Sequence, residues 1–133
     1  MKASGLIILD SGSDAKMAWA DVAILGEQLT VTPVVAESLC AQYPSISQHA
    51  CKTATFGQHL PGALLPHALE HLTIELLVQT YPNETFAGTT RWLERSEQTM
   101  QVRVSVPSDG DGAATRRAFS KAIELLNGFV GAA

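Results

Sequence analysis

The chain has 133 residues, of which 46% are hydrophobic and 17% are charged, and its formal net charge is −4. This length and composition suffice for one ordinary hydrophobic core, so we expect a single domain over residues 1–133. The negative charge argues against a nucleic acid or an anionic membrane as a partner. Two cysteines, no apolar run of about 18 residues and no N-terminal targeting signal predict a cytoplasmic protein.

The first half of the chain predicts two strands and a helix. Apolar and β-branched residues predict strands at 5–9 and 17–25, which we expect to pair across a polar loop at 10–14. Thr32 and Pro33 are typical of a helix start, and Pro44 stops this helix after about residue 43. Residues 45–64 show no periodicity and predict a long loop of the kind that often carries function.

The second half predicts a buried helix, a hairpin and a last helix. Pro66 fits the first turn of a helix whose apolar residues extend nearly all round it. Segments 89–93 and 100–106 predict a β-hairpin, and alternation in the latter indicates a half-buried strand. A final helix is expected at 113–127, with Gly128 as its stop. These elements predict an α+β fold: a two-layer α/β sandwich with a small, mostly antiparallel sheet and about three helices.

The helix that starts near Pro66 carries His67-x-x-Glu70-His71, which is the inverted zincin motif. Histidines four residues apart lie one above the other on a helix, so His67 and His71 can bind the same metal. Glu70 is then placed to act as a general base toward metal-activated water. The alternative interpretation is a pair of core histidines that hydrogen-bond to backbone carbonyls, with Glu70 on a solvated flank. We expect a zinc site with hydrolysis as its use.

A zinc site needs a further protein ligand, which this helix does not supply. Glu75 lies about 12 Å along the axis from His67, so we expect it only to orient His71. The ligand must come from another segment, where the candidates are His49, Cys51 and His59. Cys51 is the strongest, because a Cys-His-His set leaves the fourth position for water, and His49 then joins Glu75 as a supporting residue. A closed structural site would instead take His49 or His59 as a fourth ligand.

Two segments of the chain carry a family resemblance. The run His67-x-x-Glu70-His71-x-x-x-Glu75-Leu76 precedes Phe86-Ala87-Gly88-Thr89-Thr90-Arg91, and Pro44 to Cys51 reads Pro-Ser-Ile-Ser-Gln-His-Ala-Cys. Together they resemble the N-terminal domain of cyanophycin synthetase. That domain has a similar His-x-x-Glu-His helix, a later Phe-Gly-x-Thr-Arg segment and an upstream Pro-Gly-Leu-x-x-His-x-Cys.

The resemblance implies a domain that engages an aspartate-arginine polymer and that, in some members, cuts it as a metallopeptidase. It implies zinc ligands at Cys51, His67 and His71 and a general base at Glu70. Arg91 would bind a substrate carboxylate in a two-pronged contact. Where the family has a Gly-Gly-Phe and basic residues between its Cys and first His, the segment from Lys52 to His59 is shorter and nearly uncharged, and 133 residues leave no room for the synthetic modules. We therefore expect a hydrolase of a peptide-like amide or, alternatively, a non-catalytic module that binds a polymer or a synthetase partner.

Overall fold

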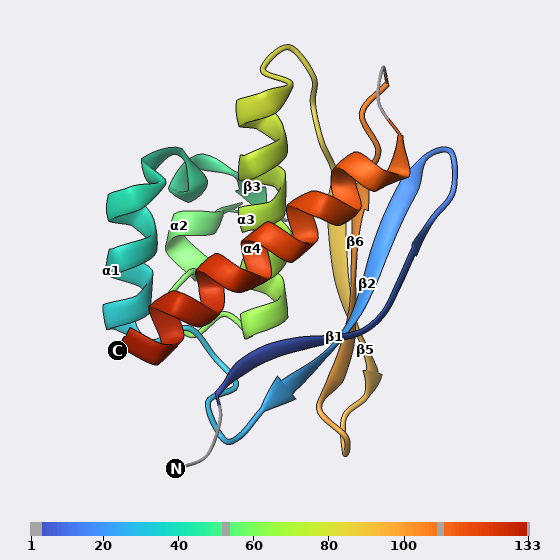
Figure 1. Ribbon diagram of the computed structural model, residues 1–133. Helices are drawn as coiled ribbons and strands as arrows, with labels where there is room; N and C mark the ends of the chain where they lie inside the picture. The colour runs from blue at the N-terminus through green and yellow to red at the C-terminus, as the bar shows by residue number, and fades with distance from the viewer. Residues whose placement is uncertain (1–3, 52–53, 109–110, 133) are drawn as a thin grey trace.

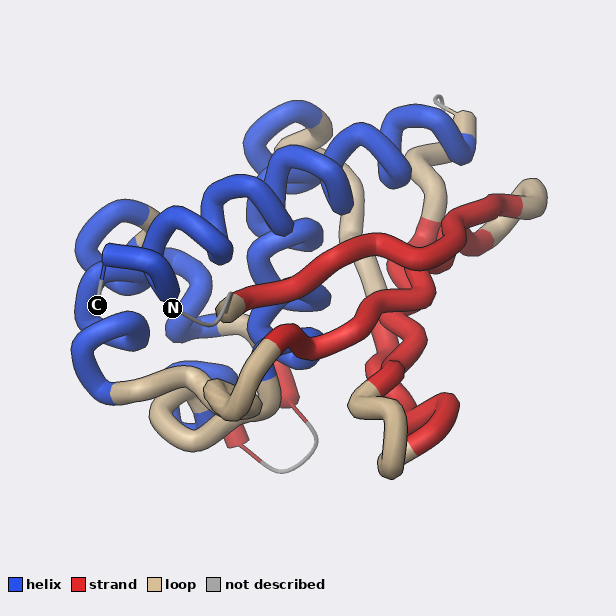
Figure 2. Tube along the Cα trace, turned by 60° about the horizontal axis from the view of Figure 1, so that its bottom comes forward, coloured by secondary structure: helices blue, strands red, loops and turns tan. Residues whose placement is uncertain are grey.

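The computed structural model describes residues 4–51, 54–108 and 111–132, with the side chains of residues 50, 51, 54 and 132 outside that description. It has two layers, an antiparallel sheet and a set of helices on one of its faces (Figure 1). The predicted α+β sandwich is therefore confirmed. Figure 2 shows the helices gathered on one side of the strands. The described part contains four α-helices rather than about three.

The sheet has the strand order β1-β2-β6-β5 and is antiparallel throughout. Its strands are β1 (Gly5–Ser13), β2 (Met17–Leu25), β5 (Gly88–Glu94) and β6 (Thr99–Ser105). In β2 and β6 every second residue is buried, because successive side chains point to opposite faces of a strand. The face toward the helices is formed in these strands by Ala18, Ala20, Val22, Ile24, Met100, Val102 and Val104.

The helical layer contains α1 (Pro33–Gln42), α2 (Phe56–His59), α3 (Leu65–Thr80) and α4 (Gly112–Ala132). Thr32 caps α1 as expected, since its hydroxyl accepts a hydrogen bond from the amide of Val35. Eleven of the 16 residues of α3 are buried, which confirms a helix that is enclosed nearly all round. α3 lies against α4 and against β5 and β6 (Figure 1). A backbone bridge between Thr30 and Leu64 holds the start of α3.

Three predicted boundaries are wrong. Residues 10–13 continue β1 instead of forming a loop, because a bulge between Ile8 and Asp10 lets the polar segment keep pairing with β2. The segment 45–64 contains a 3-10 helix at Pro44–Gln48, a short hairpin of β3 (Ala50–Cys51) and β4 (Ala54–Thr55), and α2. Helix α4 passes through Gly128 to Ala132, since Val130 in its last turn is buried and Gly128 is not among the positive-φ residues.

Candidate metal centre

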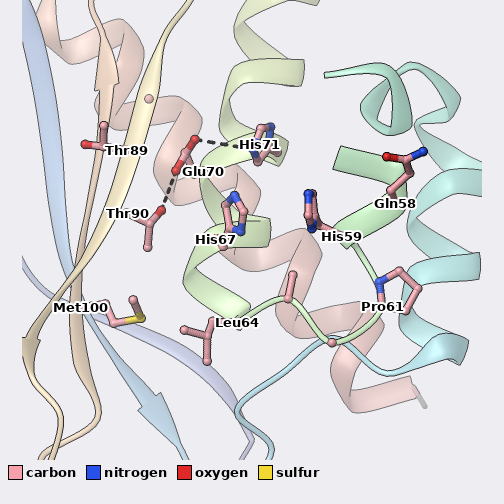
Figure 3. A pocket seen from close by; sticks show the side chains of 13 residues that line it. Gln58, His59, Pro61, Leu64, His67, Glu70, His71, Thr89, Thr90 and Met100 are labelled. Atoms are coloured by element: carbon pink, nitrogen blue, oxygen red, sulfur yellow. Dashed lines mark hydrogen bonds and ion pairs between the residues drawn. The ribbon is translucent and has the colours of Figure 1, made fainter. Parts of the chain in front are cut away.

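A cavity of about 790 Å³ lies between α3 and the beginning of β5. The segment between α2 and α3 forms its other wall, with Gln58 and His59 at its rim (Figure 3). His67, Glu70 and His71 reach it from the first two turns of α3. The helix that buries apolar residues elsewhere thus presents its polar motif to an open space.

The three motif side chains converge on one point. One nitrogen of His67, one of His71 and one carboxylate oxygen of Glu70 all lie within 4.8 Å of one another. The Nε2 atom of His71 is 3.6 Å from Oε2 of Glu70. The other carboxylate oxygen accepts a hydrogen bond of 2.6 Å from the hydroxyl of Thr90 on β5 (Figure 3). The two imidazoles suit a transition metal such as zinc, and the carboxylate lies beside them.

The opposite side of His71 is enclosed by a chain of hydrogen bonds. Nδ1 of His71 is 3.1 Å from Nδ1 of His49, and Nε2 of His49 is 3.0 Å from Oε1 of Glu75. The hydroxyl of Ser45 lies 2.8 Å from both oxygens of Glu75. Phe56 of α2 stacks on the His71 ring, with centroids 3.9 Å apart and an interplanar angle of 18°. We call Ser45–Glu75–His49–His71 the hydrogen-bond chain.

The hydrogen-bond chain fits one tautomer of His71 in particular. A carboxylate can only accept, so Nε2 of His49 donates to Glu75. If Nδ1 of His49 carries no proton, it accepts a hydrogen bond from Nδ1 of His71. In this tautomer Nε2 of His71 carries no proton and faces Glu70. An unprotonated nitrogen with its partner nitrogen held by a hydrogen bond is the state that metal-binding histidines adopt.

Burial shifts the protonation of both groups in this cluster. The pKa of His71 is lowered to about 3, first because burial disfavours the charged ring and then because His67 and His49 lie close by. Burial also raises the pKa of the Glu70 carboxyl, against the opposing effect of the hydrogen bond from Thr90. His71 is therefore neutral at physiological pH, and the pKa of Glu70 moves toward the range in which a general base works best.

The structure brings most, but not all, of the sequence candidates together. His49 contacts His71, whereas Glu75 reaches His71 only through His49. Both ring nitrogens of His49 are engaged, which opposes its use as a ligand in this geometry. His59 is exposed across the cavity and is not part of the cluster among the described side chains. The side chain of Cys51 lies outside the described part of the chain, so its assignment as a ligand stays a prediction.

Arg91 does not point to the cavity. It is exposed on β5, and its guanidinium donates two hydrogen bonds to Oε1 of Gln101 on β6. Thr90, its neighbour, faces Glu70 instead, because adjacent residues of a strand point to opposite faces. Sequence reasoning missed Thr90, Ser45 and the stacked Phe56. In the predicted strand 89–93, side chains alternate between the two faces, and this alternation was the one feature of the sequence that could have placed Thr90 on the face opposite to Arg91.

Comparison with protein-family models, curated proteins and solved structures gave no match to this chain. The resemblance to the cyanophycin synthetase domain therefore remains a prediction from the sequence. In the portions of the chain that are described, no helix combines the length and the hydropathy needed to cross a membrane.

Proposed function

We propose that this domain is a zinc-dependent hydrolase that cleaves a peptide-like amide bond. The observation that carries the proposal is the convergence of His67, Glu70 and His71 within 4.8 Å beside an open cavity. The sequence resemblance suggests an aspartate-arginine polymer as the substrate. It also suggests Cys51 as the ligand that joins the two histidines. This proposal uses the same residues that the inverted zincin motif assigns to metal binding and to proton transfer.

The donor atoms of the site fit zinc. Metal binding requires histidines without a proton on the ligating nitrogen, and the hydrogen-bond chain together with burial keeps His71 in that state. His67 and His71 would hold the ion from one face of α3. When bound, zinc supplies a Lewis acid that polarises the amide carbonyl and activates water.

Glu70 provides the proton transfer. Thr90 holds Oε1 of Glu70, so Oε2, which faces His71, is the oxygen that takes a proton from water and returns it to the departing amine. Burial raises the pKa of Glu70, which makes the carboxylate a stronger base than an exposed one. Thr90 also keeps the carboxylate in one orientation, because its hydrogen bond joins β5 to α3.

Zinc content and cleavage test this function in two steps. Protein purified without a histidine tag should contain about one zinc per chain, and this zinc should be lost in His67→Ala/His71→Ala and largely lost in Cys51→Ala. Glu70→Gln should keep the zinc but cleave aspartate-arginine oligomers or ordinary peptides about 10²–10⁴-fold more slowly. Glu124→Gln, on an exposed position of α4, is the matched control and should cleave like the unchanged protein.

Each step has an outcome that contradicts the proposal. Full zinc content in the double histidine variant would exclude the metal site. Equal cleavage by Glu70→Gln and by the unchanged protein would remove Glu70 from the reaction. Zinc binding without cleavage of any tested peptide would instead favour the alternative predicted from the sequence, a non-catalytic module that binds a polymer or a synthetase partner.

A further inference from the structure

Strand β5 is an edge of the sheet, and its free edge begins at the candidate metal centre. Within the described parts of the chain, the strand order places β6 on one side of β5 and no strand on the other. Gly88, Thr89 and Thr90 line the same cavity as His67 and Glu70. In Figure 3, Thr90 points toward Glu70, whereas Thr89 points away from it. The free edge and the motif residues of α3 therefore share one space.

The register shows which backbone groups of β5 point outward. The amide of Ser105 donates to the carbonyl of Ala87 at 2.9 Å, so this pair is hydrogen-bonded. Hydrogen-bonded and non-hydrogen-bonded pairs alternate in an antiparallel ladder, and Gly88 opposite Val104 is therefore a non-hydrogen-bonded pair. By the same alternation, the N–H and C=O groups of Gly88 and Thr90 point away from β6. No backbone hydrogen bond to them occurs among the described residues.

The part of this edge that borders the cavity, Gly88 to Thr90, lacks the features that usually block free edges, because the charged residues of β5, Arg91 and Glu94, lie beyond it. Native sheets protect an edge with charged residues, proline or a bulge. The only bulge in β5 lies between Trp92 and Glu94, beyond the part that borders the cavity. Gly88 has no side chain, and a Cβ there would lie 2.8 Å from Cγ of Glu70, so its backbone approaches the general base closely. The other edge strand, β1, has a bulge in its middle and contacts α4.

We propose that an extended peptide pairs with the free edge of β5 through its main chain and thereby presents one of its amide bonds to Glu70. This inference rests on the proposed hydrolase function and names its substrate class: a peptide segment in β conformation, bound as an additional strand. Main-chain pairing supplies regular hydrogen bonds independent of side-chain identity.

The cavity favours uncharged side chains on that peptide. Apart from the three histidines and Glu70, the described residues that line it are uncharged, and Leu64 and Met100 provide apolar surface. Arg91, the cation that the sequence assigned to substrate carboxylates, is on the opposite face of β5. Among the described residues, the cavity wall therefore offers no lysine or arginine to an acidic side chain. Recognition through the main chain is consistent with this lining.

Hydrogen exchange on the metal-free full chain tests the pairing without any turnover. The probe is a blocked hexathreonine peptide, which is uncharged, prone to extended structure and identical on both of its edges. At ten times its Kd, the peptide should slow exchange of the Gly88 and Thr90 amides about tenfold. The amides of Thr89 and Arg91, which already bond to β6, should not change. General stabilisation of the protein would not produce this alternation between protected and unchanged amides along β5.

Two matched pairs sharpen the test. Thr90→Val and Thr90→Pro both lack the hydroxyl that contacts Glu70, but only proline lacks the outward amide, and proline is tolerated at such an edge position. Thr90→Pro should bind the probe about fivefold more weakly than Thr90→Val, as expected for one lost hydrogen bond. Hexathreonine methylated at every amide nitrogen should lose binding. A peptide methylated at alternate amides keeps one of its two edges able to pair with β5 and should still bind.

The outcomes separate this inference from the proposed function. Alternating protection in metal-free protein supports edge pairing even if zinc content and cleavage both fail. Unchanged exchange at Gly88 and Thr90 with millimolar peptide, in both metal-free and zinc-loaded protein, overturns edge pairing even if cleavage is observed. Equal protection of Thr89 and Thr90 overturns it as well, because it would show that the peptide binds elsewhere.

Discussion

The two sides of His71 differ in how completely their polar groups are paired. Away from the cavity, its Nδ1 joins the hydrogen-bond chain, in which the distances between partners run from 2.8 to 3.1 Å. Toward the cavity, its Nε2 is 3.6 Å from the Glu70 carboxylate, which is beyond normal hydrogen-bond range. One side of the ring is thus fixed by the fold, and the other faces a cluster of ligand-type atoms.

This difference separates the two interpretations of the motif. Core histidines satisfied by the fold would be hydrogen-bonded to backbone carbonyls, as the simpler interpretation required. His71 instead bonds to another histidine, which is itself held by a carboxylate. A ring that is fixed at one nitrogen and aimed at a donor cluster with the other is the arrangement found in metal sites. The hydrogen bond at Nδ1 of His71 therefore supports the assignment of its Nε2 to metal binding.

The largest expected effect is on the acid stability of the metal-free protein. The pKa of His71 is about 3 in the folded protein against 6.5 for an ordinary histidine. Below pH 6.5 the unfolded chain therefore binds a proton at His71 that the folded chain does not bind. The contribution of His71 to the free energy of unfolding is fully present above pH 6.5. It is lost as pH falls toward 3, by up to about 1.4 kcal/mol per pH unit. Denaturant unfolding at a series of pH values measures it.

His71→Gln is the comparison, since glutamine does not titrate. The free energy of unfolding of this variant should depend less on pH between 6.5 and 3 than that of the unchanged protein. Glu70 acts in the opposite direction, because its raised pKa favours the protonated carboxyl in the folded protein. Its contribution to the free energy of unfolding is present below pH 4.5 and declines as pH rises through the folded pKa. An identical pH slope in His71→Gln would contradict the burial of a neutral ring.

A smaller effect is expected on zinc affinity when the hydrogen-bond chain is broken. His49→Ala removes the partner that fixes Nδ1 of His71, and loss of such a partner typically weakens metal binding about 10–100-fold. His59→Ala is the matched control, because His59 lines the cavity but lies outside the donor cluster. Zinc titration against a competing chelator measures both. Loss of zinc in His59→Ala with retention in His49→Ala would reverse the roles given to these two residues.

What the sequence predicted well was local, and what it missed was set by contacts between distant segments. His67, Glu70 and His71 share one helix, so helical spacing alone places them together. Arg91 was assigned to the site from segment similarity, but the packing of β5 against α3 turns Thr90 inward and Arg91 outward.

The end of α4 and the long predicted loop also depend on contacts between distant segments. Gly128 reads as a helix stop, yet α4 continues because Val130 packs in the core. The segment 45–64 has no periodicity, and its order comes from contacts with α3: Ser45 and His49 reach Glu75, and Phe56 stacks on His71. Such contacts span 15 to 30 residues of chain, which a periodic pattern cannot encode.

The smallest expected effect concerns the outer end of the hydrogen-bond chain. Ser45 is exposed but donates to the buried Glu75, so Ser45→Ala should lower the free energy of unfolding by about 1 kcal/mol, because water replaces part of the lost hydrogen bond. Ser47→Ala, in the same 3-10 helix, is the control, since the Ser47 hydroxyl bonds to the carbonyl of Pro44 and not to Glu75. Zinc affinity should change far less in Ser45→Ala than in His49→Ala, because Glu75 still accepts from His49. Equal losses of zinc affinity in the two variants would mean that the whole chain, rather than His49 alone, sets the state of His71.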